Sequence, residues 1–130
     1  MELMLDTCGF LSLTGFSDKK LSEDARLLVE RSGHVFISSC SLFEMAIKHK
    51  KGNIDIQPFG NAKLLWNTAI GEYGLSELPV TGDVFYESIR LPDHHGDPFD
   101  RIIIEEALRR RVPIVTHDAV FDDYGVETVR

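Results

Sequence analysis

Short apolar segments that alternate with helical patterns are the feature of this sequence that most constrains its fold. Leu3–Leu5 and Val35–Ser38 are short and mostly apolar, as buried parallel strands are. Between them, Ser22 caps a segment with acidic residues in its first turn, apolar residues at helical spacing and Gly33 just past its end. A strand, a helix and a second strand in this order predict a β-α-β unit with a right-handed crossover.

The rest of the chain continues this alternation. Helices are predicted at 41–51, 62–73, 83–90 and 98–111, and strands at 113–116 and 126–129. Ser41 is followed three residues later by Glu44, which is the spacing of a capping box and predicts that Glu44 lies in the first turn of its helix. The predicted fold class is therefore α/β, with a twisted parallel sheet of four or five strands sandwiched between helices, and the 130 residues fit one domain, 1–130.

The composition argues against several classes of protein. The formal net charge of -7 does not suit a protein that holds nucleic acid by bulk electrostatics, because such binding needs Lys and Arg to neutralise phosphates. No apolar run approaches the ~20 residues that cross a bilayer, and no basic leader precedes an apolar stretch, so we expect a soluble, cytoplasmic protein with no membrane partner. Cys8 and Cys40 lack the spacing of a zinc site, which fits a reducing compartment.

Acidic residues follow the predicted strands where these strands end. Asp6 comes directly after the first strand, and Asp118 lies two residues beyond the strand that closes at Thr116. Glu44 follows the second strand on its helix, and Asp100 lies in the first turn of the longest helix. Because ligands of α/β sheets collect at the carboxyl ends of the strands, we expect these four acids to face one edge of the sheet.

Four carboxylates at one edge predict a bound cation. Without one, they would repel each other and raise each other's pKa. Carboxylate oxygens with few His or Cys nearby suit Mg²⁺, with Mn²⁺ as a substitute, and such a metal keeps several water molecules. One ion would lower the pKa of an attacking water, and a second would stabilise a leaving oxygen, so hydrolysis of a phosphodiester is the predicted chemistry.

Four blocks of the sequence, in this order, resemble the PIN-domain family, and particularly the VapC-like toxins of bacterial and archaeal toxin-antitoxin pairs. The blocks are Leu5-Asp6-Thr7, Ser41 to Lys48, His95 to Arg101, and Val115 to Asp118. Each block alone is weakly specific, but their order is specific, and the resemblance covers nearly the whole length.

The resemblance implies a Mg²⁺-dependent endoribonuclease that hydrolyses RNA phosphodiester bonds, as the toxin of a type II pair with a cognate antitoxin protein. It also implies a PIN-like sheet and a homodimer. The catalytic, metal-binding positions of the family match Asp6, Glu44, Asp100 and Asp118.

Four further residues match supporting positions of this subgroup. Thr116 matches a hydroxyl beside the metal site, and Asp97 matches a recurrent acid whose contact with metal the sequence leaves open. Lys48 and Arg101 match recurrent basic positions, and they would either position phosphate or balance the carboxylates by pairing.

Other interpretations stay open at this point. The same carboxylates would serve another metal-dependent phosphodiesterase, a phosphatase or a DNA nuclease, and a catalytically silent PIN-fold protein-binding module would keep the fold. Asp97 is interpreted first as the N-cap of its helix. The pair His94-His95 is interpreted as a solvated loop outside the active site, because adjacent residues rarely point at one ion, and Arg109 to Arg111 as a cluster at the end of a helix.

Overall fold

All five strands of the protein form one parallel sheet. The computed structural model describes residues 1–130, and the strand order is β3-β2-β1-β4-β5, with every neighbouring pair parallel. The strands are β1 (Glu2–Leu5), β2 (His34–Ser38), β3 (Leu75–Leu78), β4 (Ile114–Val115) and β5 (Thr128–Val129). The predicted α/β class and its parallel sheet are therefore confirmed.

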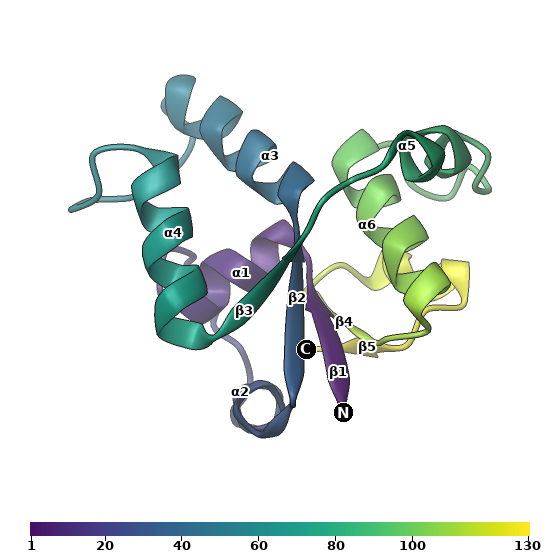
Figure 1. The fold of residues 1–130 in the computed structure, drawn as a ribbon, viewed down its shortest axis with the longest axis horizontal. Helices are drawn as coiled ribbons and strands as arrows, with labels where there is room; N and C mark the ends of the chain where they lie inside the picture. Colours follow the sequence, from purple (N-terminus) through teal and green to yellow (C-terminus); the bar gives the residue numbers. More distant parts are fainter.

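Helices connect the strands and cover both faces of the sheet (Figure 1). They are α1 (Thr7–Thr14), α2 (Glu23–Arg31), α3 (Ser39–Lys50), α4 (Ala62–Tyr73), α5 (Gly82–Ile89), α6 (Pro98–Arg110) and the 3-10 helix η1 (Ala119–Tyr124). In Figure 1, α1 and α4 lie on one side of the sheet, and α5 and α6 lie on the other. No helix is both long enough and apolar enough to pass through a membrane.

The central strand β1 separates two apolar cores. Leu3 and Leu5 point into a core built mainly with α1, α2 and α4, whereas Met4 points into a second core built with α5 and α6. All three side chains are fully buried. Successive residues of a strand face opposite sides of the sheet, and here an apolar core covers each side. This double burial explains why three successive residues of the strand, Leu3 to Leu5, are apolar.

Two elements were absent from the sequence-based prediction, and one helix begins earlier than predicted. The helix α1 and the edge strand β3 were not predicted. Helix α3 begins at Ser39, with Ser38 as its N-cap, so Glu44 lies in the second turn and the capping-box prediction is wrong. The hydroxyl of Ser41 instead accepts a hydrogen bond from Thr7 of α1 at 2.8 Å, which ties the starts of two helices together.

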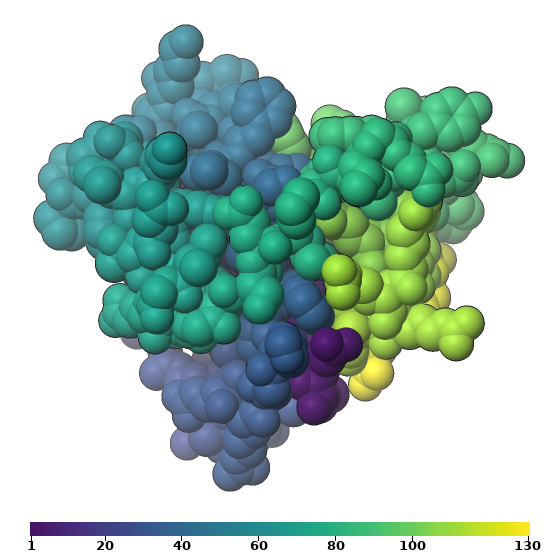
Figure 2. All heavy atoms as spheres, in the orientation of Figure 1, coloured from purple at the N-terminus to yellow at the C-terminus, as the bar shows by residue number.

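The carboxyl ends of β1 and β2 point toward a hollowed part of the surface. Both strands run toward the end of the molecule where α3 begins, and β4 runs parallel to them. In the space-filling view, the surface is notched between α3 and α5 at this end (Figure 2). Side chains just beyond the strand ends are therefore presented at one edge.

Candidate metal centre

Asp6 is fixed at the end of β1 by the two elements that flank it. Its side chain caps α1, where Oδ1 accepts a hydrogen bond from the backbone N–H of Gly9 at 2.5 Å. Its other oxygen, Oδ2, accepts a hydrogen bond from the hydroxyl of Thr116 at 2.6 Å. Thr116 directly follows β4, the strand paired with β1, so the pairing of the strands brings these two residues together. The carboxylate is 2% exposed and held in one orientation.

Gly9 lets α1 approach the sheet closely enough for this arrangement. A Cβ atom at this position would collide with the carbonyl oxygen of Val115 and would lie 3.0 Å from Oδ1 of Asp6. The absence of a side chain thus allows the first turn of α1 to rest on the end of β4.

Burial raises the pKa of Asp6 to about 6. The hydrogen bonds from Thr116 and Gly9 oppose this shift, and the charges of Glu44 and Asp118 add to it. Glu44 and Asp118 thus act on Asp6 from the same edge of the sheet.

Glu44 projects from α3 with one oxygen paired and one unpaired. Oε2 lies 2.8 Å from Nζ of Lys48, one helical turn further along. Oε1 is buried and has no hydrogen-bond partner, although Glu44 is only 5% exposed. Buried carboxylate oxygens are rarely left unpaired, so this atom is available to a cation.

Asp100 and Asp118 come from two different elements and meet at a histidine. Asp97 caps α6 and accepts hydrogen bonds from the backbone N–H groups of Phe99 and Asp100, which places Asp100 in the first turn. Asp118 caps η1, where Oδ1 accepts from a backbone N–H. Nε2 of His95 lies 2.9 Å from Oδ2 of Asp100 and 3.0 Å from Oδ2 of Asp118. The N-cap interpretation of Asp97 is therefore confirmed.

The pKa of Asp100 is raised to about 8. Burial is the largest cause, and the charges of Asp97, Asp6, Glu44 and Asp118 add to it in that order. Because four nearby acids add to the effect of burial, the negative charge around Asp100 favours a bound cation.

Three of the four acids line one cavity. Asp6, Asp100 and Asp118 surround a space of about 520 Å³, together with Cys8, Ser17, Asp18, Lys19, His117 and Ala119. Glu44 does not line this space, but its charge acts on Asp6 and Asp100. The structure thus brings the four predicted acids to one edge, in agreement with their order along the chain.

The donor set suits a hard divalent cation. Oxygen atoms of several carboxylates surround a cavity that has room for water, as Mg²⁺ and Mn²⁺ require. The buried and unpartnered Oε1 of Glu44 adds a further free oxygen nearby. Only one lysine, Lys48, forms an ion pair with any of the four acids. The residues present therefore fit a metal ion.

Arg101 has different contacts from those expected of a residue that handles phosphate. Its guanidinium donates hydrogen bonds to the backbone carbonyls of Ile89, Leu91, Pro92 and His95 at 2.7 to 3.1 Å. The side chain is buried and makes no ion pair with the four acids. Its contacts support a role in fixing the loop before α6, rather than either of the two roles expected from the sequence.

The sequence-based interpretation of His95 is wrong. It placed both histidines of the pair outside the active site, but the imidazole of His95 contacts Asp100 and Asp118, and the ligand atoms of these three residues lie within 4.8 Å of one another. Its neighbour His94 is exposed and packs edge-on against Tyr124. The two side chains point in different directions, so one histidine of an adjacent pair reaches the acids while the other stays outside.

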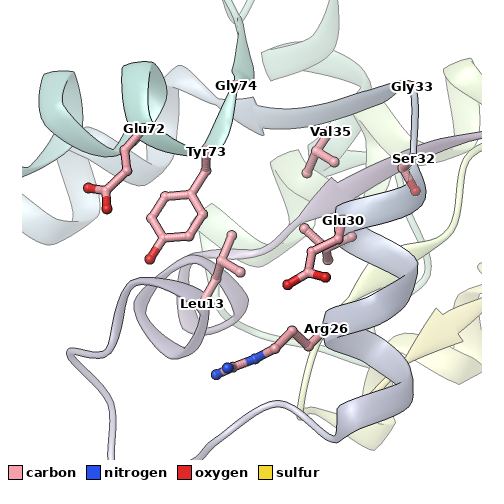
Figure 3. A pocket seen from close by; sticks show the side chains of 10 residues that line it. Leu13, Arg26, Glu30, Ser32, Gly33, Val35, Glu72, Tyr73 and Gly74 are labelled. Atoms are coloured by element: carbon pink, nitrogen blue, oxygen red, sulfur yellow. The ribbon is translucent and has the colours of Figure 1, made fainter.

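A second cavity lies away from the acids. It measures about 340 Å³ and is lined by residues of α1, α2, α4 and β2 and of the loops beside them. Figure 3 shows Leu13, Arg26 and the carboxylate of Glu30 directed into this space, with the ring of Tyr73 beside them. None of the four acids lines it, so it is separate from the candidate metal centre.

Comparisons with known proteins identify a matching family model and solved structures of similar fold. The family model of the PIN domain matches residues 3–127, whereas no curated protein matches the sequence. Three solved structures have a similar fold. VapBC2 from Rickettsia felis, bound to a DNA fragment from its promoter, has 16% identity and a TM-score of 0.68, covering 98% of this chain and 97% of that one. FitAB bound to an IR36 DNA fragment has 14% identity and a TM-score of 0.66, covering 97% and 92%.

The third structure, FitAcB from Neisseria gonorrhoeae, has 14% identity and a TM-score of 0.58, covering 98% of this chain and 96% of that one. At these identities, the likeness concerns the fold alone. The family model, in contrast, matches nearly the whole chain, and its span includes β1, β4 and all four acids. This chain therefore belongs to the PIN-domain family.

Proposed function

We propose that this protein is a Mg²⁺-dependent endoribonuclease that hydrolyses RNA phosphodiester bonds, with residues 1–130 acting as one nuclease domain. The observation that carries the proposal is the cavity lined by Asp6, Asp100 and Asp118, with the unpartnered oxygen of Glu44 nearby. A structural role would pair these carboxylates with Lys or Arg side chains, and among the four acids only Glu44 has such a partner, whereas Asp100 and Asp118 share the imidazole of His95. Carboxylates that repel each other and lack cationic partners in the protein are expected where a divalent ion completes the site.

Each residue has a distinct task in this proposal. A bound divalent cation supplies a Lewis acid that polarises the phosphate and lowers the pKa of an attacking water. Asp6, Glu44, Asp100 and Asp118 hold the ion and are the proposed catalytic residues. Thr116 donates to Oδ2 of Asp6 and thereby orients the carboxylate without adding charge.

Lys48 and Asp97 act on this site through other residues. Lys48 holds Oε2 of Glu44 and leaves Oε1, which has no partner, free to bind an ion. Asp97 fixes the first turn of α6 and, with it, the backbone of Asp100.

Cleavage by the purified protein tests the proposal. We expect Mg²⁺ or Mn²⁺ to support cleavage of single-stranded RNA and EDTA to abolish it. Asp100→Asn should lower the rate by more than about 100-fold, because Asn keeps the shape of the side chain and removes its charge. Asp123→Asn, on an exposed acid outside the cavity, is the matched control and should retain the wild-type rate.

Thermal unfolding separates loss of chemistry from loss of fold. The metal-free Asp100→Asn variant should be at least as stable as wild type, because Asn keeps the shape of the side chain and cannot ionise, whereas burial and the neighbouring acids disfavour ionisation of Asp100. An inactive but stable variant assigns Asp100 to the chemistry. Equal cleavage by wild type and variant would refute the assignment.

The rival functions give different results in the same assay. Faster cleavage of DNA, or of a small phosphate ester, would favour a DNA nuclease or phosphatase. Absence of both Mg²⁺ binding and cleavage would favour a silent binding module. The choice of RNA is supported by the resemblance of the four sequence blocks to VapC-like toxins.

We also propose a cognate antitoxin as the protein partner. Two of the solved structures of similar fold are VapBC2 and FitAB, each bound to a DNA fragment. An antitoxin that covers the acidic cavity would block RNA. Co-expression with the product of the neighbouring gene should suppress growth arrest and yield a complex that cleaves no RNA, whereas arrest that persists would argue against this partner.

A homodimer is proposed because α5 leaves large apolar side chains in solvent. Phe85, Tyr86 and Ile89 are 49%, 64% and 76% exposed, and exposed apolar groups of this size favour association. Sedimentation should give a dimer for wild type and a shift toward monomer for Ile89→Lys. A monomeric wild type would contradict the proposal.

A further inference from the structure

The imidazole of His95 is held at both of its nitrogen atoms. Its Nδ1 accepts a hydrogen bond from the backbone N–H of Asp97 at 3.1 Å. Its Nε2 lies 2.9 Å from Asp100 and 3.0 Å from Asp118. The ring is 15% exposed and packs edge-on against Phe121, with the centroids 5.9 Å apart. The orientation of the ring is therefore set by the protein.

The contact at Nδ1 determines where the proton lies. A backbone N–H group only donates, so Nδ1 must present its lone pair to Asp97. The neutral ring then carries its proton on Nε2, which faces two carboxylate oxygens that accept it. A protonated ring would place a second N–H against that of Asp97, and the other neutral tautomer would place a lone pair against both carboxylates.

We propose that His95 is a positioning residue that holds Asp100 and Asp118 together by sharing its Nε2–H between them, and that it is not a ligand of the metal ion. A nitrogen that carries a proton has no lone pair for a metal. The shared proton attracts one oxygen of each carboxylate to a common point, so the pair keeps its spacing while other lone pairs face the cavity. This inference rests on the proposed metal-dependent function.

The surrounding contacts fix His95 for this task. Its backbone N–H donates to the hydroxyl of Tyr124 at 2.8 Å, and its carbonyl accepts from Arg101 at 3.0 Å. The guanidinium of Arg101 thus positions the backbone of a residue that in turn positions two acids. Outer partners of metal ligands commonly contribute to affinity in this way.

Two substitutions distinguish hydrogen-bond donation by His95 from the packing of its ring. His95→Gln places an amide N–H near the position of Nε2 but removes the ring, whereas His95→Phe keeps a ring against Phe121 but has no donor. His94→Gln is the matched control, because it makes the same change in the adjacent, exposed histidine. Mn²⁺ affinity of the full chain is measured by calorimetry at one fixed pH, with thermal unfolding of the metal-free proteins alongside.

We expect His95→Phe to weaken Mn²⁺ binding by about 10- to 100-fold and His95→Gln to restore most of it. His94→Gln should bind as wild type does. Equal affinity of wild type and His95→Phe would overturn the inference, and so would an equal loss in both His95 variants, because packing and not donation would then matter. Unfolding temperatures close to wild type show that the comparison is made between folded proteins.

The tautomer is measured independently by nitrogen NMR of the imidazole with and without Mg²⁺. A proton that stays on Nε2 in the Mg²⁺-loaded protein supports positioning, and loss of that proton on loading would make His95 a ligand and overturn the inference. RNA cleavage distinguishes the two proposals. A wild type that binds Mn²⁺ and cuts no RNA refutes the proposed function alone, whereas RNA cleavage with Mn²⁺ affinity unchanged in His95→Phe refutes the inference alone.

Discussion

Metal binding at the candidate centre should release protons and should therefore depend strongly on pH. Burial and the neighbouring acids raise the pKa of Asp100 to about 8, and burial raises the pKa of Asp6 to about 6. A divalent ion binds the ionised carboxylates, so it competes with protons at both groups. Raising the pH from 6 to 8 removes these protons beforehand and strengthens the apparent affinity.

The magnitude of this effect can be worked out from the two pKa values. At pH 7, Asp100 is protonated in about nine of ten metal-free molecules and Asp6 in about one of ten, so binding one ion should release about one proton in total. Between pH 8 and pH 6, the apparent affinity for Mg²⁺ should fall about 100-fold, most of it through Asp100.

Calorimetry in two buffers of different ionisation enthalpy measures the released protons, and titrations at pH 6, 7 and 8 measure the affinity. In Asp100→Asn, the release at pH 7 should nearly vanish and the change in affinity from pH 8 to 6 should shrink to about twofold, because only Asp6 then titrates. A wild type that releases no proton at pH 7, or whose affinity is the same at pH 6 and 8, would refute the reasoning.

Two further predictions concern stability. Burial raises the pKa of Glu106 from 4.5 to about 7, so the native state keeps a proton that the unfolded state loses, and the free energy of unfolding should fall as the pH rises from about 4.5 to 7. Urea unfolding should show Glu106→Gln more stable than wild type by roughly 3 kcal/mol at pH 8 and by little at pH 4, and a pH-independent difference would contradict this. Gly9→Ala should lower stability by about 1–3 kcal/mol and weaken Mn²⁺ binding, because its Cβ would collide with Val115 and displace Asp6. Gly71→Ala, where a Cβ meets nothing within 4 Å on helix α4, is the control and should not destabilise; equal effects of the two alanines would contradict the collision.

The central part of the fold was predictable because burial on both faces leaves a strong pattern in the sequence. In strand β1, Leu3 to Leu5 are apolar and buried between two cores, and β2 likewise has four buried residues in a row. Strand β3 was missed because it lies at an edge and carries Ser76 and Glu77 between its two buried leucines. Its identity as a strand depends on pairing with β2, which is a tertiary contact.

Helix α1 was missed for a different reason. Six of its eight residues are buried, including Thr7, Gly9 and Ser12, so small polar residues occupy positions where an amphipathic pattern would place apolar ones. These small residues allow α1 to rest on the end of β4 and to receive the cap of Asp6. The small residues that weaken the amphipathic pattern of α1 are thus the same residues that let α1 pack beside the candidate site.

The position of the four acids was predictable and that of His95 was not, because the acids are placed by the order of strands and helices, whereas His95 is placed by side-chain contacts in a loop. Asp6 and Asp118 come just after parallel strands, and the residues just after parallel strands meet at a common edge, so their order along the chain is sufficient. His95 belongs to a loop, and its direction depends on Arg101, which is buried and holds four carbonyls of residues 89–95. Arg101, which was predicted from its place in a sequence block either to position phosphate or to balance the carboxylates, instead holds the loop. It is connected to Asp100 and Asp118 through His95, whose imidazole contacts both carboxylates. A block such as His95 to Arg101 therefore combines a residue proposed to bind an ion, Asp100, with residues that hold others in place, and side-chain contacts are needed to separate the two.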